Sequence, residues 1–131
     1  MELEVTREAL TAMRAAAAAA HPHEACGLLL GQGTHIAEVR EAANIHPAPA
    51  THFEIDPQAL IDAHRAARSG GAQVVGYFHS HPAGPAAPSA TDRAMAAGDG
   101  RVWAIIAGED VRFWQDAGEG FTALSYRVTE G

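Results

Sequence analysis

Apolar residues recur with helical spacing at two places in the chain. Leu10 and Met13 fall on one face of residues 7–20, a segment that also contains a run of alanine, the best helix former. Residues 57–68 follow Asp56, a natural N-cap residue, and begin with proline, which fits the first helical position because it has no N–H to satisfy. Both segments are predicted to be helices.

Short apolar runs, alternating segments and stretches rich in β-forming residues predict strands around these helices. The expected strands are Met1–Val5 as an edge strand, Cys26–Gly31, Thr34–Ala43, Thr51–Ile55, Gln73–His79, Val102–Ala107, Val111–Gln115 and Phe121–Val128. A third, short helix is expected over Ser89–Ala97. Because the strands cluster near the end without regular alternation with helices, the pattern favours an α+β or three-layer α/β fold with a mixed sheet.

Composition narrows the functional classes. The chain has 131 residues, the size of a single domain over 1–131, and a formal net charge of −7, from 16 acidic residues and nine basic residues that are all arginine. An acidic chain without a basic run is a poor ligand for nucleic acid and is better suited to neutral or basic partners or to metal cations. No stretch approaches the roughly 18 apolar residues of a membrane span. We therefore expect no nucleic acid, no membrane and a cytoplasmic location.

The single cysteine, Cys26, excludes an internal disulfide and every zinc site that needs two or more cysteines. As a nucleophile, it would need a histidine and an electropositive setting. A small buried thiol is the preferred interpretation. His21 and His23 fall at a turn between a helix and a strand and are expected to be surface residues.

The segment His79-Ser80-His81-Pro82 carries the most informative spacing. Two residues apart on a strand, His79 and His81 point to the same face. A loop then leads to Ser89, and Asp92 lies in the first turn of the next helix, so that its carboxylate can return beside both imidazoles. Two histidines and one aspartate leave a fourth tetrahedral position open, as in catalytic zinc sites.

Such a site also needs a base that is not itself a ligand. Zinc lowers the pKa of a bound water toward about 7, and a nearby carboxylate can take its proton and return it to a leaving amine. Glu24, just before the apolar strand, is the candidate. Ser89 can donate a hydrogen bond to the oxyanion that forms. Taken singly, these residues also have ordinary explanations: a surface carboxylate for Glu24, and helix capping for Ser89 and Asp92.

Taken together, Glu24 and the spacing His79-Ser80-His81-Pro82-x6-Ser89-x-x-Asp92 resemble the JAMM (MPN+) metalloprotease motif at every defining position. Residues 22–31, 44–47, 53–57 and 76–82 also resemble segments of the compact bacterial and archaeal members. The resemblance implies a cytidine-deaminase-like α/β/α fold with a mixed, curved sheet. It also implies a zinc peptidase or deubiquitinase-like isopeptidase.

Carried over by position, the resemblance assigns one zinc ion to His79, His81 and Asp92, the general acid/base role to Glu24, and the oxyanion donor to Ser89. Ser80 is expected to face away from the ligands and to be structural. The implied substrate is a ubiquitin-like sulfur-carrier protein of the ThiS/MoaD type, cut after its C-terminal Gly-Gly, with its tail added along a sheet edge.

Three alternative functions differ in the residues that they require. A non-catalytic MPN scaffold with structural zinc would not need Glu24. A peptidase acting on cell-wall or phage-tail peptides is a second alternative. A zinc deaminase of the related fold would require a Pro-Cys-x-x-Cys pair, which a chain with one cysteine lacks. The cognate substrate, the cleavage position and the oligomeric state stay open, and an oligomer is allowed.

Overall fold

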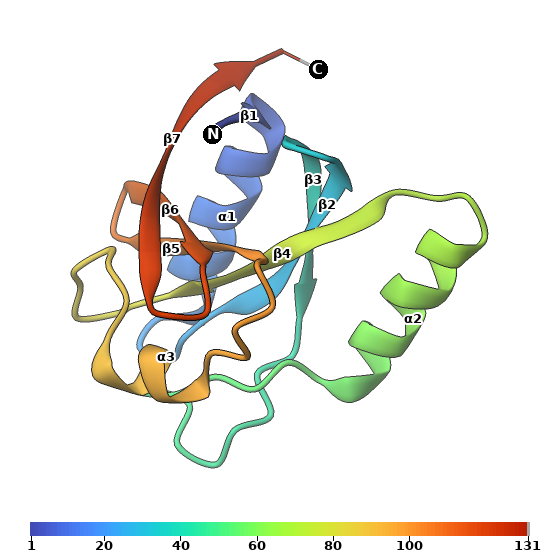
Figure 1. Ribbon diagram of the computed structural model, residues 1–131. Coiled ribbons are helices and arrows are strands. Elements are labelled where there is room, and N and C mark those ends of the chain that lie inside the picture. The colour runs from blue at the N-terminus through green and yellow to red at the C-terminus, as the bar shows by residue number, and fades with distance from the viewer. Residues whose placement is uncertain (131) are drawn as a thin grey trace.

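The strands form one mixed sheet that curls until its two ends meet. In this computed structural model, which describes residues 1–130, the elements follow as β1 (Glu2–Thr6), α1 (Arg7–Ala20), β2 (Cys26–Gln32), β3 (His35–Ala42), α2 (Pro57–Arg68), β4 (Gln73–Ser80), α3 (Ala90–Met95), β5 (Val102–Ala107), β6 (Asp110–Asp116) and β7 (Phe121–Thr129) (Figure 1). The strand order is β1-β3-β2-β4-β5-β6-β7, and β7 pairs with β1 to close the sheet. The mixed α+β fold expected from the sequence is confirmed.

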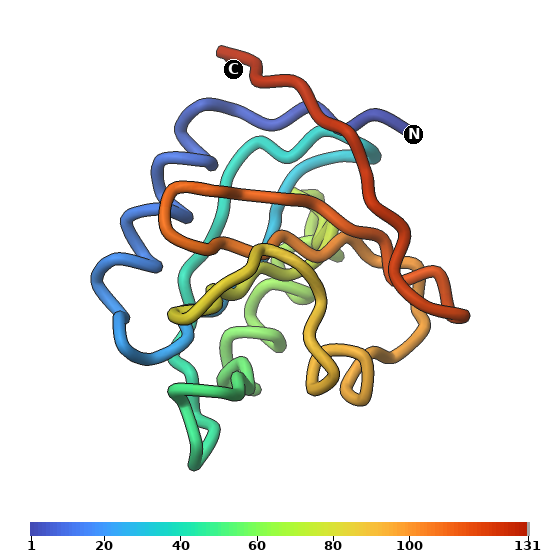
Figure 2. Tube along the Cα trace, turned by 90° about the vertical axis from the view of Figure 1, so that its left-hand side faces the viewer, coloured from blue at the N-terminus to red at the C-terminus, as the bar shows by residue number. Residues whose placement is uncertain are grey.

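Helices α1 and α2 cover opposite faces of this sheet. Successive side chains of a strand point to opposite faces, and β2 is buried on both. Leu29 packs in the cluster that contains the apolar side of α1, whereas Leu28 and Leu30 pack with Ala63 of α2. Figures 1 and 2 show α1 and α2 on opposite sides of the central strands, and both termini at the end of the molecule away from α3.

Two strand predictions were wrong. The N-terminal strand is not an edge, because β1 lies between β3 and β7 and runs parallel to both. The segment Thr51–Ile55 does not form a strand; its one ladder contact is the isolated bridge between Asn44 and Ile55. Its backbone groups bond instead to the Asn44 side chain, which accepts from the amide of Glu54 and donates to the carbonyl of His52.

Side chains cap the starts of α1 and α2, and the cap of α2 is the predicted Asp56. Thr6 Oγ1 accepts a hydrogen bond from the Ala9 amide at 3.1 Å, and Asp56 accepts one from the Gln58 amide at 3.1 Å. Helix α3 is shorter than the predicted 89–97 and ends at Met95, where the backbone becomes extended. None of the helices in residues 1–130 has the length and apolar character needed to cross a membrane.

Gly76 lies at a point of close approach between the central strands. A Cβ at this position would overlap the backbone carbonyl of Val102 on β5. Gly76→Ala is therefore expected to lower the free energy of unfolding by about 3 kcal/mol or more, because neither strand can move without breaking its ladder. Urea unfolding checks this, with Ser125→Ala on exposed β7 as a control. Equal midpoints for the two variants would contradict it.

Candidate metal centre

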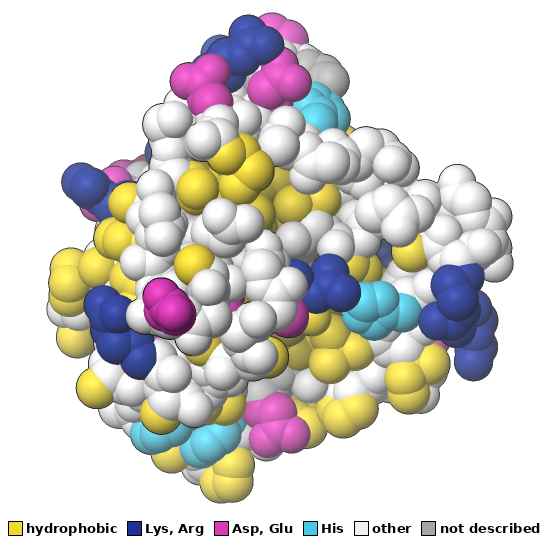
Figure 3. Space-filling view, viewed as in Figure 1, with side chains coloured by type: hydrophobic (Ala, Val, Ile, Leu, Met, Phe, Trp, Pro, Cys, Tyr) yellow, Lys and Arg dark blue, Asp and Glu magenta, His cyan; other side chains and the backbone are white. Residues whose placement is uncertain are grey.

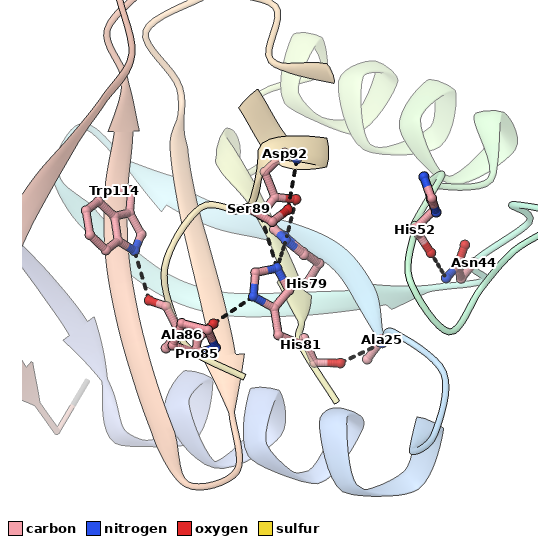
Figure 4. A network of polar contacts seen from close by, with 11 residues as sticks. Ala25, Asn44, His52, His79, His81, Pro85, Ala86, Ser89, Asp92 and Trp114 are labelled. Carbon is pink, nitrogen blue, oxygen red and sulfur yellow. Dashed lines mark hydrogen bonds and ion pairs between the residues drawn. The ribbon is translucent and has the colours of Figure 1, made fainter. Parts of the chain in front are cut away.

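Three buried donor groups converge at the carboxyl end of β4. His79 lies near the end of this strand, His81 follows it, and Asp92 lies in the first turn of α3. The Nε2 atom of His79 is 3.0 Å from Oδ1 of Asp92, and that of His81 is 3.0 Å from Oδ2. The two Nε2 atoms are 3.1 Å apart. Figure 4 shows both rings and the carboxylate turned toward one point.

These separations fit the coordination shell of a small cation. With zinc–ligand bonds of 2.0–2.2 Å, neighbouring ligands of a tetrahedron are about 3.3–3.6 Å apart, a few tenths of an ångström more than the observed 3.0–3.1 Å. Each histidine Nε2 faces both the other Nε2 and a carboxylate oxygen, and one ring proton cannot serve two such contacts. His79, His81 and Asp92 are thus positioned to bind a metal ion. The predicted convergence of these three residues is confirmed.

Each histidine ring is oriented by a different kind of contact. The Nδ1 of His81 is 2.7 Å from the carbonyl of Pro85, which only accepts, so Nδ1 carries the proton and leaves Nε2 as a lone-pair donor. The ring of His79 stacks on Phe53 with 4.3 Å between centroids, and Trp103 packs edge-on against it at 5.6 Å. The Nδ1 of His79 has no hydrogen-bond partner among residues 1–130, so on that side of the ring its orientation depends on packing against Phe53 and Trp103.

The loop that carries Pro85 is itself held in place. Trp114 Nε1 on β6 donates a hydrogen bond to the carbonyl of Ala86 at 3.2 Å (Figure 4). The Pro85 carbonyl is therefore a fixed acceptor for His81. Sequence reasoning missed this partner, because a backbone carbonyl leaves no signal in the residue types.

The protonation states of the group suit metal binding. Burial disfavours ionisation of Asp92, but its hydrogen bonds to His79 and His81 outweigh burial and hold the pKa of the carboxyl well below its usual range. Burial lowers the pKa of His79 and keeps that ring neutral. Burial also acts against protonation of His81, but Asp92 and the Pro85 carbonyl outweigh it and raise its pKa. A metal ion bound at Nε2 would compete with protonation of that atom.

Glu24 lies beside the three donors without belonging to them. Cys26 on β2 pairs with His79 on β4, and the register continues as the Ser80 amide donates to the Ala25 carbonyl at 3.0 Å. Glu24 is therefore the next residue along, level with His81. Its residue surface is 6% exposed, and burial raises the pKa of its carboxyl to about 7, with the His81 charge opposing this and that of Asp92 adding to it.

Ser80 and Ser89 both bond to the backbone near the site. Ser80 Oγ accepts a hydrogen bond from the Ala25 amide at 2.8 Å, in agreement with the structural role expected for it. Ser89 caps α3: its Oγ accepts from the Asp92 amide, and its own amide donates to Asp92 Oδ2, both at 3.0 Å. The capping interpretation is confirmed, and the Ser89 hydroxyl keeps its hydrogen for a further acceptor.

Four other histidines, His21, His23, His46 and His52, do not belong to the donor group. His21 and His23 are exposed, as expected. His46 and His52 stack on each other with 4.6 Å between centroids. Two further residues near the site were missed: Phe53, which packs on His79, and Asn44, whose amide bonds to the Glu24 carbonyl. Their residue types alone carry no catalytic signal.

Cys26 is expected to be chemically inert in the folded protein. It is buried, its Sγ lies 3.7 Å from the carbonyl oxygens of Ala42 and Ala43, and burial raises its pKa to about 12. At pH 8 the thiolate fraction is then on the order of 10⁻⁴. Iodoacetamide should modify Cys26 only after unfolding, as intact mass measurement would show. Rapid alkylation of the native protein would restore the cysteine as a candidate nucleophile.

The amino-acid sequence of this chain is similar to that of a known protein family and of several known proteins. The family described as prokaryotic homologues of the JAB domain matches residues 6–117. A protein of Haloferax volcanii named desampylase is 34% identical over 125 residues, covering 91% of this chain and 88% of that protein. A probable TtuB-protein conjugate cleaving protease of Thermus thermophilus is 38% identical over 90 residues, covering 69% of this chain and 60% of that protein.

The fold of this chain is also similar to that of solved structures. The solution structure of protein DSY2949 from Desulfitobacterium hafniense superimposes with a TM-score of 0.86 at 30% identity and covers 98% of this chain and 94% of that one. The family match extends over most of the chain, including Glu24, His79, His81 and Asp92. The resemblance to the JAMM (MPN+) family is therefore confirmed, and the chain belongs to the compact prokaryotic branch of the JAB domain family.

Proposed function

We propose that this protein is a zinc-dependent peptidase or isopeptidase that hydrolyses the bond after the C-terminal Gly-Gly of a ubiquitin-like sulfur-carrier protein. One observation carries the proposal: a group of three buried metal donors lies beside Glu24, a buried carboxylate outside the donor set. A purely structural metal site has no use for such a carboxylate. This argues against a non-catalytic scaffold.

His79, His81 and Asp92 would hold one zinc ion. When bound with an open coordination position, zinc supplies a Lewis acid and lowers the pKa of a water toward neutrality. The protein contributes the geometry, since Phe53 and Trp103 orient His79 and the Pro85 carbonyl orients His81.

Glu24 is suited to moving a proton. Its carboxylate would accept a proton from the attacking water and pass it to the nitrogen of the leaving amine. Without a metal ion, burial raises the pKa of this carboxyl to about 7. A cation held by the donors would lower that pKa and favour the form that accepts a proton.

Ser89 would act at the oxygen of the scissile carbonyl. Its Oγ is fixed at the start of α3 by the hydrogen bond from the Asp92 amide, so its hydroxyl can donate without first being ordered. The same cap holds Asp92, and one short motif therefore positions both a metal donor and an oxyanion donor.

The substrate class is supported by the relatives. One is named desampylase and another is named as a protease that cleaves TtuB–protein conjugates. We extend this to a ubiquitin-like partner for the present chain, in the cytoplasm, with one zinc per chain. Two glycines before the scissile bond would present no side chains to a narrow site.

We propose no nucleic-acid partner for this protein. On the face shown in Figure 3, the arginine side chains of the described residues are dispersed rather than gathered in one patch. Ion pairs join Arg7 to Glu130, Arg14 to Glu109, Arg101 to Asp99, Arg112 to Asp110, and Arg127 to Glu2 and Glu4.

An intact-mass assay tests the function. Zinc-loaded protein is mixed with sulfur-carrier proteins of the same genome, each extended past Gly-Gly or joined to a lysine side chain. A product ending in Gly-Gly, absent after chelation, supports the proposal. Unchanged masses for every carrier, with one zinc per chain bound, would refute the substrate class and favour another peptide substrate or a scaffold.

A further inference from the structure

The side-chain amide of Asn44 makes four hydrogen bonds to backbone groups. Its Nδ2 donates to the carbonyls of Glu24 and His52, both at 3.0 Å. Its Oδ1 accepts from the amides of His46 and Glu54, both at 3.1 Å. An amide offers two donor hydrogens and two acceptor lone pairs, so this side chain is fully used. Figure 4 shows the amide bonded to the His52 carbonyl.

The first consequence concerns Glu24. Its carbonyl accepts from Asn44, and its amide donates to the carbonyl of Pro49 at 2.7 Å. Both backbone polar groups of Glu24 are thus bonded to the segment 44–49. The next residue, Ala25, is bonded through its amide and carbonyl to Ser80 of β4. The backbone that carries the carboxylate is therefore held from two sides.

The second consequence concerns His79. Asn44 also bonds to the His52 carbonyl and the Glu54 amide, which belong to the residues on either side of Phe53. The ring of Phe53 stacks on His79 at 4.3 Å between centroids, with 18° between the ring planes. One amide consequently ties the backbone of Glu24 to the segment that packs on a proposed metal ligand.

We propose that Asn44 is a positioning residue, which sets the place of the Glu24 carboxylate relative to the metal donors. It acts through Glu24 and contacts neither the substrate nor the metal. This inference rests on the proposed function, in which Glu24 transfers the proton. The chemistry requires asparagine: aspartate lacks the two donor hydrogens, alanine lacks all four bonding sites, and glutamine is longer by one methylene.

The chain offers a matched control at the far end of β4. The side-chain amide of Gln73 also donates to two backbone carbonyls, those of Ala67 at 3.2 Å and Gly71 at 3.3 Å. Gln73→Ala removes the same kind of bonds from a loop remote from the donor group. It is expected to leave kcat and KM unchanged.

Steady-state kinetics on an extended carrier provide the first test. Asn44→Ala and Asn44→Asp should each lower kcat by about 10- to 100-fold, since a displacement of about 1 Å at the reacting groups has that effect. We expect KM to change by less than about threefold and zinc to stay at one per chain, because neither variant touches the substrate or the donors. Glu24→Gln is measured beside them.

Hydrogen exchange gives a readout that does not depend on activity. In Asn44→Ala, the amides of Glu24, His46 and Glu54 should exchange at least about tenfold faster, while that of Leu29 in β2 stays protected. Asn44 is also the sole asparagine in the sequence. Selective ¹⁵N-asparagine labelling therefore yields one side-chain NH₂ pair, whose slow exchange in the unaltered protein would report the four bonds directly.

The outcomes are separable. If Glu24→Gln is inactive and both Asn44 variants keep the kcat of the unaltered protein, the positioning role is wrong and the proposed function survives. If Glu24→Gln is fully active, the proposed function fails first. The inference is overturned if both Asn44 variants lose zinc or fail to fold, or if Gln73→Ala lowers kcat by the same factor. Each of these results would show that Asn44 has a general structural role.

Discussion

Glu24→Gln is expected to lower kcat by about 10²- to 10⁴-fold without loss of zinc. Glutamine keeps the shape of the side chain but cannot accept a proton at the pH of the reaction, and general acid–base catalysis contributes about this much to a rate. Zinc should remain, because the three donors bond to one another and not to Glu24. Turnover of an extended carrier measures the loss of kcat, and elemental analysis of the purified variant measures the zinc that it retains.

The same substitution should stabilise the metal-free protein at alkaline pH. Burial raises the pKa of Glu24 to about 7 in the folded state, so folding opposes ionisation as the pH rises from the unfolded value of 4.5 through 7. Glutamine removes this effect, and above pH 7 the gain is about 1–2 kcal/mol after allowance for solvent screening. A gain that is equally large at pH 4 would contradict this origin.

Asp92→Asn is expected to weaken zinc binding by at least about 10³-fold and to abolish turnover. An amide oxygen is neutral and binds a divalent cation poorly, and the two histidines alone leave two positions without protein ligands. Zinc would then no longer raise the melting temperature, because stabilisation by a ligand follows its affinity for the folded state. Thermal unfolding with and without zinc, together with elemental analysis, measures this.

Ser89→Ala separates the metal role of Asp92 from its role in the helix cap. This variant removes the acceptor for the Asp92 amide but leaves the carboxylate and both histidines in place. It should cost about 1 kcal/mol of stability and keep zinc at one per chain. Zinc retention in Asp92→Asn, or its loss in Ser89→Ala, would contradict the proposed ligand set.

The proposed ligands were predictable because short-range geometry determines most of their arrangement. Residues two apart on a strand share a face, which explains the convergence of His79 and His81. The Ser89-x-x-Asp92 spacing is that of a capping box, and the cap holds the Asp92 carboxylate at the start of α3. Both patterns span only a few residues.

The two wrong strand predictions both concern contacts between segments that are distant in the sequence. The alternating polar and apolar residues 2–5 predict a strand, but whether that strand is an edge depends on the curvature that lets β7 return to β1. Residues 51–55 have strand-like composition, yet their backbone bonds to one asparagine side chain. Residue propensity cannot reveal a bond whose partner lies elsewhere in the fold.

The sequence by itself determined the residues capable of chemistry: two histidines on one face, an aspartate at a helix start and a carboxylate before a buried strand. The tertiary structure decided their distances. Glu24 comes level with His81 because Cys26 pairs with His79, and a shift of one residue would turn each side chain of β2 to the other face. Covalent geometry fixes neighbours within a few residues, whereas segments about 55 residues apart are placed by strand register, packing and contacts such as those of Asn44.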